Sequence, residues 1–211
     1  MTNASSAAQV TAVLGDVRSL AEQVGRSDGQ ALVPAAGIWE ACRSVPALRT
    51  ALAAHGRDVL AAQEWPMIVR AHELARAGQA RELVALDREW TATAADRQFS
   101  EASFRVGQRQ LNRLRPLRDQ RVVQKYLAAV EAGEARGWHP LVYGIVLAVF
   151  NLPLRQGLMN FAAQTLGGFA DAAIEAHRLP EGECVRLLDE LCATLPASLP
   201  PLPDAGLFAA A

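Results

Sequence analysis

The sequence predicts an all-α protein, a single-domain bundle of about eight to ten helices. Alanine and leucine are abundant while aromatic residues make up 6% of the 211 residues, a composition that suits helices packed on helices. No convincing stretch alternates apolar and polar residues as a half-buried strand would, and no repeat of fixed period is present. With 51% hydrophobic and 20% charged residues, the chain can bury a sizeable core.

The expected elements fall into an irregular N-terminal segment (1–45), a helical core domain (46–195) and a proline-rich tail (196–211). The first segment contains one helical stretch near 10–24, followed by residues punctuated by glycine and proline. The core begins with a Ser44 cap and with Pro46 in the first turn. Apolar residues at helical spacing then predict helices over 46–62, 65–77, 79–95, 97–114, 119–132, 139–150, 154–176 and 182–195, with breaks at Gly78, Pro116, Gly133/Gly137, Pro153 and residues 180–182.

Two of these helices are expected to be central. Residues 141–150 are apolar around most of the helix circumference, which predicts a buried helix. The helix over 154–176 contains Gly167 and Gly168, which together destabilise an isolated helix by about 2 kcal/mol. With Gly144, they permit close approach of helices, either between two copies of the chain in a homodimer or within one copy.

The stretch SEASFRVGQRQLNRL, residues 100–114, places three arginines on one side of a helix and small residues on the other. Arg105, Arg109 and Arg113 fall within about 80° of one another on a helical wheel. Gly107 lies on the opposite side, where a mid-helix glycine costs about 1 kcal/mol relative to alanine and lets another backbone come close. The arginine side is either a solvated surface or a docking face for an acidic partner.

Charge is unevenly distributed along the chain. The net charge is −1, which gives no argument for nucleic-acid or membrane binding. Residues 97–125, however, contain eight basic and two acidic side chains, so the rest of the chain is acidic. A basic patch on an acidic body favours oriented docking on a protein partner.

Patterns typical of catalysis or metal binding are weak. No glycine-rich phosphate loop follows a strand, and His139, which precedes a proline at a helix start, fits capping or packing better than ligation. His177 and Cys184 are seven residues apart, but Pro180 and Gly182 between them disturb the helix that would align them. We therefore expect no enzyme activity, no tight metal site and no resident cofactor, with an all-α enzyme as the least favoured class.

The location expected from the sequence is cytoplasmic. Three scattered cysteines suggest a reducing compartment. The start, MTNASSAAQV, lacks the basic and apolar regions of a secretory signal. The longest largely apolar run, 141–152, is too short to span a bilayer.

Several motifs together resemble the UreF family of urease accessory proteins. EASFRVGQR at 101–109 resembles that family's "EASLRMGRRLLRL" helix, and WHPLVYG at 138–144 resembles its "H-x-V-x-x-G" start of a buried helix. PEGE at 180–183 stands where the family has "P-L-G-Q", and the tip at Leu207 and Phe208 resembles its terminal "R-L-F". The similarity covers about residues 45–195 plus that tip. The family's N-terminal signature is reduced to PAAGIWE at 34–40, and Glu183 replaces the late glutamine.

The resemblance implies a non-enzymatic, all-α, dimeric protein in urease maturation. Such a protein binds UreD (also called UreH) and the GTPase UreG, and the assembly docks on apo-urease to insert nickel in a GTP-dependent way. Carried over onto this chain, partner binding falls on Arg105, Gly107, Arg109, Arg113, His139, Tyr143, Gly144, Gly182, Leu207 and Phe208. The alternative is a stand-alone helical adaptor, a UreF-like paralogue that binds another acidic protein and has no link to urease.

Overall fold

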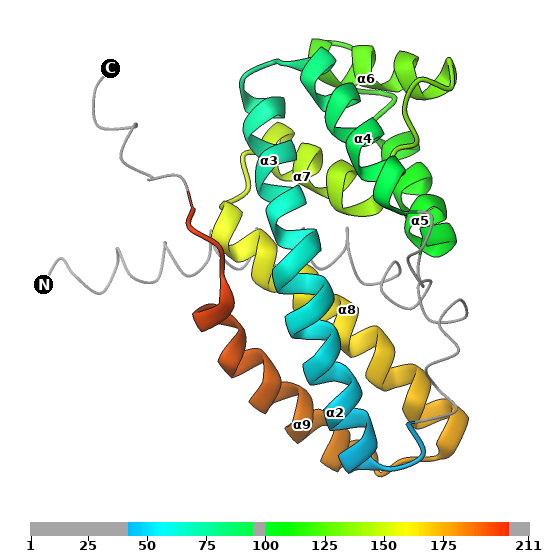
Figure 1. Cartoon of the computed structure of the whole chain (residues 1–211), viewed down its shortest axis with the longest axis vertical. Helices are drawn as coiled ribbons and strands as arrows, with labels where there is room; N and C mark the ends of the chain where they lie inside the picture. The colour runs from blue at the N-terminus through cyan, green and yellow to red at the C-terminus, as the bar shows by residue number, and fades with distance from the viewer. Residues whose placement is uncertain (1–41, 95–99, 203–211) are drawn as a thin grey trace, which may run out of the picture.

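The computed structural model describes residues 42–94 and 100–202, and over these ranges it is helical and without strands. The all-α prediction is confirmed (Figure 1). The expected helix near 10–24 and the tip at Leu207 and Phe208 lie outside the described residues. In chain order the elements are α2 (Val45–His55), the π-helical η3 (Gly56–Glu64), α3 (Trp65–Arg76), α4 (Ala80–Ala94), α5 (Ser100–Arg113), α6 (Arg121–Glu131), α7 (His139–Val149), α8 (Leu154–His177), α9 (Glu181–Thr194) and the 3₁₀ turn η4 (Leu195–Ser198).

The first three elements form one continuous helical rod, so the described residues contain seven helices rather than the expected eight to ten. The Ser44 cap is confirmed, because its side chain accepts a hydrogen bond from the backbone N–H of Ala47 at 3.4 Å. The predicted break between 62 and 65 is wrong. In the π-helical segment the N–H of Trp65 donates to the carbonyl of Leu60, five residues back, and this wider turn lets the rod continue past Pro66.

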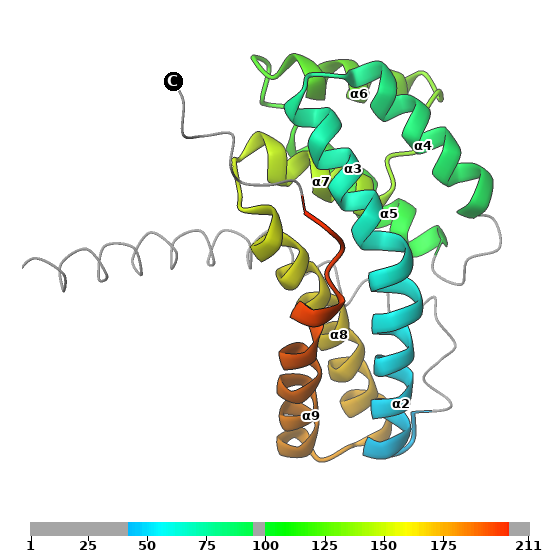
Figure 2. The same ribbon diagram turned by 60° about the vertical axis from the view of Figure 1, so that its left-hand side comes forward.

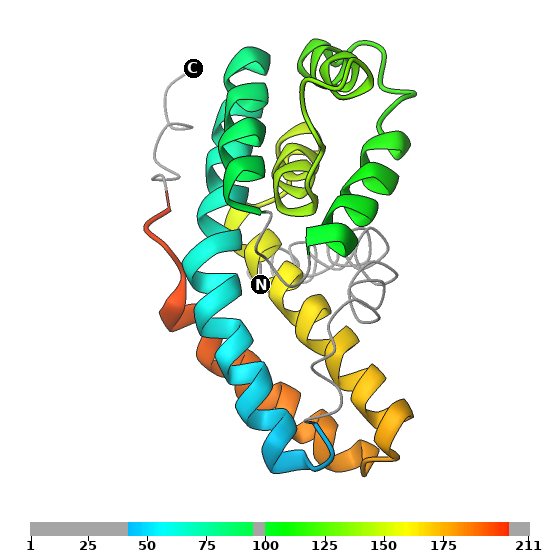
Figure 3. The same ribbon diagram turned by 45° about the vertical axis from the view of Figure 1, so that its right-hand side comes forward.

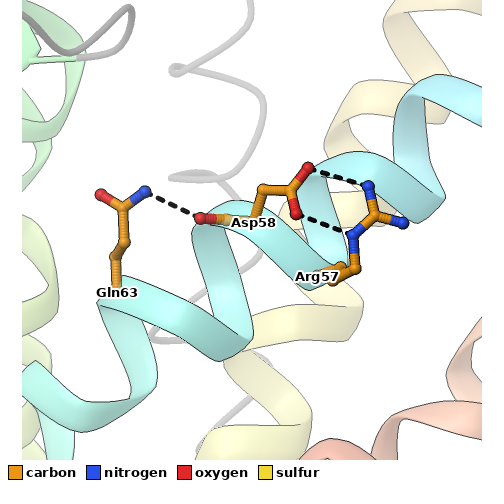
Figure 4. Close-up of polar contacts among 3 residues, drawn as sticks. All are labelled: Arg57, Asp58 and Gln63. Atoms are coloured by element: carbon orange, nitrogen blue, oxygen red, sulfur yellow. Dashed lines mark hydrogen bonds and ion pairs between the residues drawn. The ribbon is translucent and has the colours of Figure 1, made fainter.

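The solvent side of η3 carries a small polar cluster (Figure 4). The side chain of Gln63 donates to the carbonyl of Asp58 at 2.7 Å, again spanning five residues. The guanidinium of Arg57 donates to both carboxylate oxygens of Asp58, at 2.7 and 2.9 Å. Because all three side chains are near the surface, the cluster contributes little to stability.

The molecule has two apolar cores, one at each end of its long axis. At one end α2, η3, α8 and α9 enclose a cluster that includes Leu52, Leu158 and Leu187 (Figures 1 and 2). At the other end α3, α4, α6 and α7 enclose a second cluster, which includes Leu83 and Val123. Helix α7 contributes to both clusters, and every residue from 139 to 148 is buried. The prediction of a buried central helix there is confirmed.

Gly144 brings α7 against α3 within the same chain. A Cβ at this position would lie 2.6 Å from the carbonyl oxygen of Ile68 and 2.8 Å from the Cβ of Ala71. Gly167 is different, since a Cβ there would meet no atom within 4 Å. Of the glycines expected to permit close helix approach, Gly144 therefore serves packing inside the chain, and the homodimer stays a prediction.

A candidate partner-binding face on helix α5

Helix α5 lies beside the buried helix α7 (Figure 3). Its small side faces inward, and a Cβ on Gly107 would lie 2.7 Å from the carbonyl carbon of Trp138 and 2.7 Å from the backbone nitrogen of His139, with the carbonyl oxygen of Gly137 closer still. The close backbone approach expected at Gly107 is thus present, and the approaching backbone belongs to the same chain. It is the loop of residues 132–138, which joins α6 to α7.

A buried carboxylate holds this loop in place. Asp87 on α4 is fully buried. Its carboxylate accepts hydrogen bonds from the hydroxyl of Tyr126 at 2.6 Å, the N–H of Arg136 at 2.7 Å and the N–H of Gly137 at 2.9 Å. Burial, together with the charge of Asp87, raises the pKa of Tyr126 well above its ordinary value, so that this hydroxyl remains a donor.

Further contacts tie the same loop to α4 and α5. The indole N–H of Trp138 donates to the hydroxyl oxygen of Thr91 at 2.8 Å, and the amide of Gln108 donates to the carbonyl of Arg136. The ring of Phe104 meets the edge of Trp138, with centroids 6.3 Å apart, and the guanidinium of Arg136 lies 5.7 Å from the centroid of Phe104. The position of α5 is therefore fixed by polar and apolar contacts to one loop.

The arginine side of α5 faces outward. Arg105, Arg109 and Arg113 are all exposed. The guanidinium of Arg105 lies 3.0 Å from the carboxylate of Glu101, one turn earlier, and 73% of the Arg105 side chain is exposed. Such an exposed pair one turn apart contributes only about 0.3–0.5 kcal/mol to stability. The face presents positive charge to solvent on a rigidly held helix.

The predicted site residues on α7 lie in the interior. The ring of His139 packs on Phe161 with centroids 4.9 Å apart, and the hydroxyl of Tyr143 donates to the carbonyl of Gly157 at 3.1 Å. Burial, assisted by the positive charge of Arg109, lowers the pKa of His139 to about 3. Burial also raises the pKa of Tyr143. We expect these residues to affect a partner only through the position of α7.

The remaining predicted residues are not brought to α5. Gly182 is exposed near the start of α9, at the opposite end of the molecule from α6, and a Cβ there would meet nothing within 4 Å (Figure 1). Leu207 and Phe208 lie outside the described residues, so their role stays a prediction. The structure thus assembles one exposed face from Arg105, Arg109 and Arg113, together with an interior that supports it.

The described part of the chain contains neither a cluster of metal ligands nor a membrane-spanning helix. No group of three or more histidine, cysteine, aspartate or glutamate side chains there could hold a metal ion. Cys184 is buried, and burial together with the charge of Glu183 raises the pKa of its thiol. Over the same ranges, no helix has the length and apolar character needed to cross a bilayer.

Comparison with known protein families identifies the chain. The model of the UreF family matches residues 47–192, from the first turn of α2 to the last turn of α9. The chain belongs to the UreF family. UreF proteins are accessory chaperones, so membership implies an accessory role in urease maturation. The match spans both apolar cores and the whole of α5. Among curated proteins, no sequence matches this UreF chain.

Asp87 is the residue that the sequence did not reveal. It appears there as an isolated aspartate, with no second carboxylate at the spacing of a magnesium site. Its partners lie 39 to 50 residues further along the chain, at Tyr126, Arg136 and Gly137. The one local signal is its position directly after the buried Leu86 and one turn after the buried Leu83, on the inner side of a helix, where a charged residue is rare unless it is paired.

Proposed function

We propose that this UreF-family chain is a urease maturation factor that acts with a UreD/UreH-like protein and a UreG-like GTPase in GTP-dependent insertion of nickel into apo-urease. In this proposal nickel is the cargo of the assembly, and the chain supplies binding surfaces rather than chemistry. The observation that carries the proposal is the exposed arginine face of α5, held rigidly by the 132–138 loop inside the segment that matches the family.

The electrostatics of α5 fit docking on an acidic surface. Residues 104–113 of α5 include three arginines and no acidic residue, and two further arginines follow in the turn after the helix. Opposite charge across an interface accelerates association and sets orientation more than it adds affinity. Because the arginine face is exposed and the opposite side of the helix is packed, a partner can approach without unfolding any described element.

The stand-alone adaptor remains the second candidate because of two departures from the family pattern. Glu183 stands where the family has a glutamine, and only PAAGIWE at 34–40 remains of the N-terminal signature. In the family that this chain resembles, both motifs are expected to contact partners. The arginine helix, by contrast, still resembles the family pattern in this chain. An adaptor that has changed partners would retain a charged docking face and lose such motifs.

Co-purification separates the two candidates. The tagged full-length chain is expressed with the urease subunits and the UreD/UreH-like and UreG-like proteins of its own organism, and urease activity is measured after nickel addition. If the chain is a maturation factor, we expect a complex that contains both accessory proteins, and we expect urease activity to depend on this chain. A chain that neither joins this complex nor changes urease activation would instead support the adaptor.

A further inference from the structure

A hollow of about 390 Å³ lies between α5, α6 and the 132–138 loop. Its apolar lining includes Phe104, Leu111, Leu127 and Val130. Ligand pockets in proteins range from about 300 to 1,000 Å³, so this hollow has room for one large apolar side chain. None of the residues predicted from the sequence as partner-binding lines it.

The walls of the hollow are held before anything binds. The loop wall is fixed by the hydrogen bonds from the backbone N–H groups of Arg136 and Gly137 to the buried Asp87. On the α5 side, the amide of Gln108 donates to the carbonyl of Arg136 and so joins the two walls. A preformed recess loses little conformational freedom when an occupant binds.

The rim of the hollow is polar and carries two arginines, Arg115 and Arg136, and one glutamate, Glu131. Arg115 Nε donates to Asn112 at 2.8 Å, and Arg115 Nη1 lies 2.5 Å from Glu131 across the opening. Arg136 lies at the loop side, over the ring of Phe104. Asn112 lies beside the arginine face of α5. Around the helix its position is next to that of Arg105, with Arg109 further along the same face.

We propose that the hollow receives an apolar side chain from an acidic segment of a protein partner, whose carboxylates lie along the arginines of α5. Charge complementarity carries the choice of occupant, because residues 104–113 of α5, which supply one wall, contain three arginines and no acidic residue. The apolar lining supplies the anchor, and the arginines supply orientation and association rate. This inference goes beyond urease maturation and holds whatever protein contributes the segment.

Fluorescence anisotropy with the full-length chain tests the proposal. The probes are two labelled twelve-residue peptides of aspartate, glutamate and serine that differ only in a central phenylalanine or serine. Two variants share one position: Asn112→Trp fills the hollow, and Asn112→Ala leaves it open. We expect the phenylalanine peptide to bind about tenfold more tightly than the serine peptide to the unmodified chain and to Asn112→Ala. In Asn112→Trp the two peptides should bind equally.

A second measurement locates the site without any variant. A photoreactive benzoylphenylalanine at the central position of the acidic peptide should crosslink to residues 104–115 and 127–136. Crosslinks elsewhere, equal affinity of the two peptides for the unmodified chain, or an absence of binding at about 50 mM salt would each overturn the proposal. These outcomes are independent of the urease role, because a chain that fails to join the urease assembly can still discriminate between the peptides.

Discussion

Replacing Gly107 by alanine would place a methyl group against the backbone of residues 137–139. The new Cβ would lie 2.7 Å from the backbone nitrogen of His139 and nearer to the carbonyl oxygen of Gly137, so α5 or the loop must move. Overpacking of this kind costs about 1–3 kcal/mol, and a shift of the loop also weakens its hydrogen bonds to Asp87, at about 1–3 kcal/mol for each buried group left unsatisfied. The helix itself gains about 1 kcal/mol from the added alanine. We therefore expect the free energy of unfolding to fall by about 2–4 kcal/mol.

Urea denaturation followed by circular dichroism measures this change. Gly167→Ala is the matched control, because Gly167 also lies inside a helix but a Cβ there would meet nothing within 4 Å. The control should be neutral or more stable, by up to about 1 kcal/mol. If Gly107→Ala is as stable as the control, the reasoning that the 132–138 loop packs directly on Gly107 is refuted.

Three further predictions concern buried polar groups and a strained turn. Asp87→Asn should lower the free energy of unfolding by about 2–4 kcal/mol in urea denaturation, because one amide cannot accept all the bonds that the carboxylate accepts. His55, His72 and His139 have pKa values lowered by burial to about 4, 4 and 3, so the folded state stays neutral while the unfolded state binds protons below about pH 6.5. The free energy of unfolding should therefore be highest above that pH and should fall toward pH 4 by about 1.4 kcal/mol per pH unit for each histidine. A melting temperature that is unchanged between about pH 7 and pH 5 would contradict this. Arg178→Gly should increase the free energy of unfolding by about 0.5–1 kcal/mol and so raise the melting temperature. The reason is that Arg178 ends α8 at φ 52°, where glycine is favoured.

Local patterns predicted most of the helices. Helix α7 was predicted because its residues are apolar on all sides. The turn at Gly78 was expected because glycine often ends a helix, and in the structure this glycine has a positive φ of 69°. The rod over 45–76 was missed because Pro66 indicates a break in an α-helix, and no sequence pattern marks the π-helical turn that accommodates it. Local periodicity identifies helical faces but not such changes in helical pitch.

The candidate site was predictable only in part. The arginine spacing on α5 predicted one common face, and the structure places all three side chains of that face at the surface. Asp87 and the hollow could not be predicted, because both depend on contacts between residues distant in sequence. Resemblance to the family assigned His139 and Tyr143 to partner binding, but motif matching does not distinguish a contact residue from a buried residue that supports the contact.

The association rate of the purified chain with its UreD/UreH-like and UreG-like partners tests the central claim most directly. The variant Arg105→Glu/Arg109→Glu is compared with Arg155→Glu/Arg186→Glu, an equal charge change at exposed positions on α8 and α9. We predict that the α5 variant associates about tenfold more slowly at low salt, that the difference shrinks as salt is raised, and that the control matches the unmodified chain. Equal association rates for all three proteins at every salt concentration would contradict the claim that α5 is the docking face.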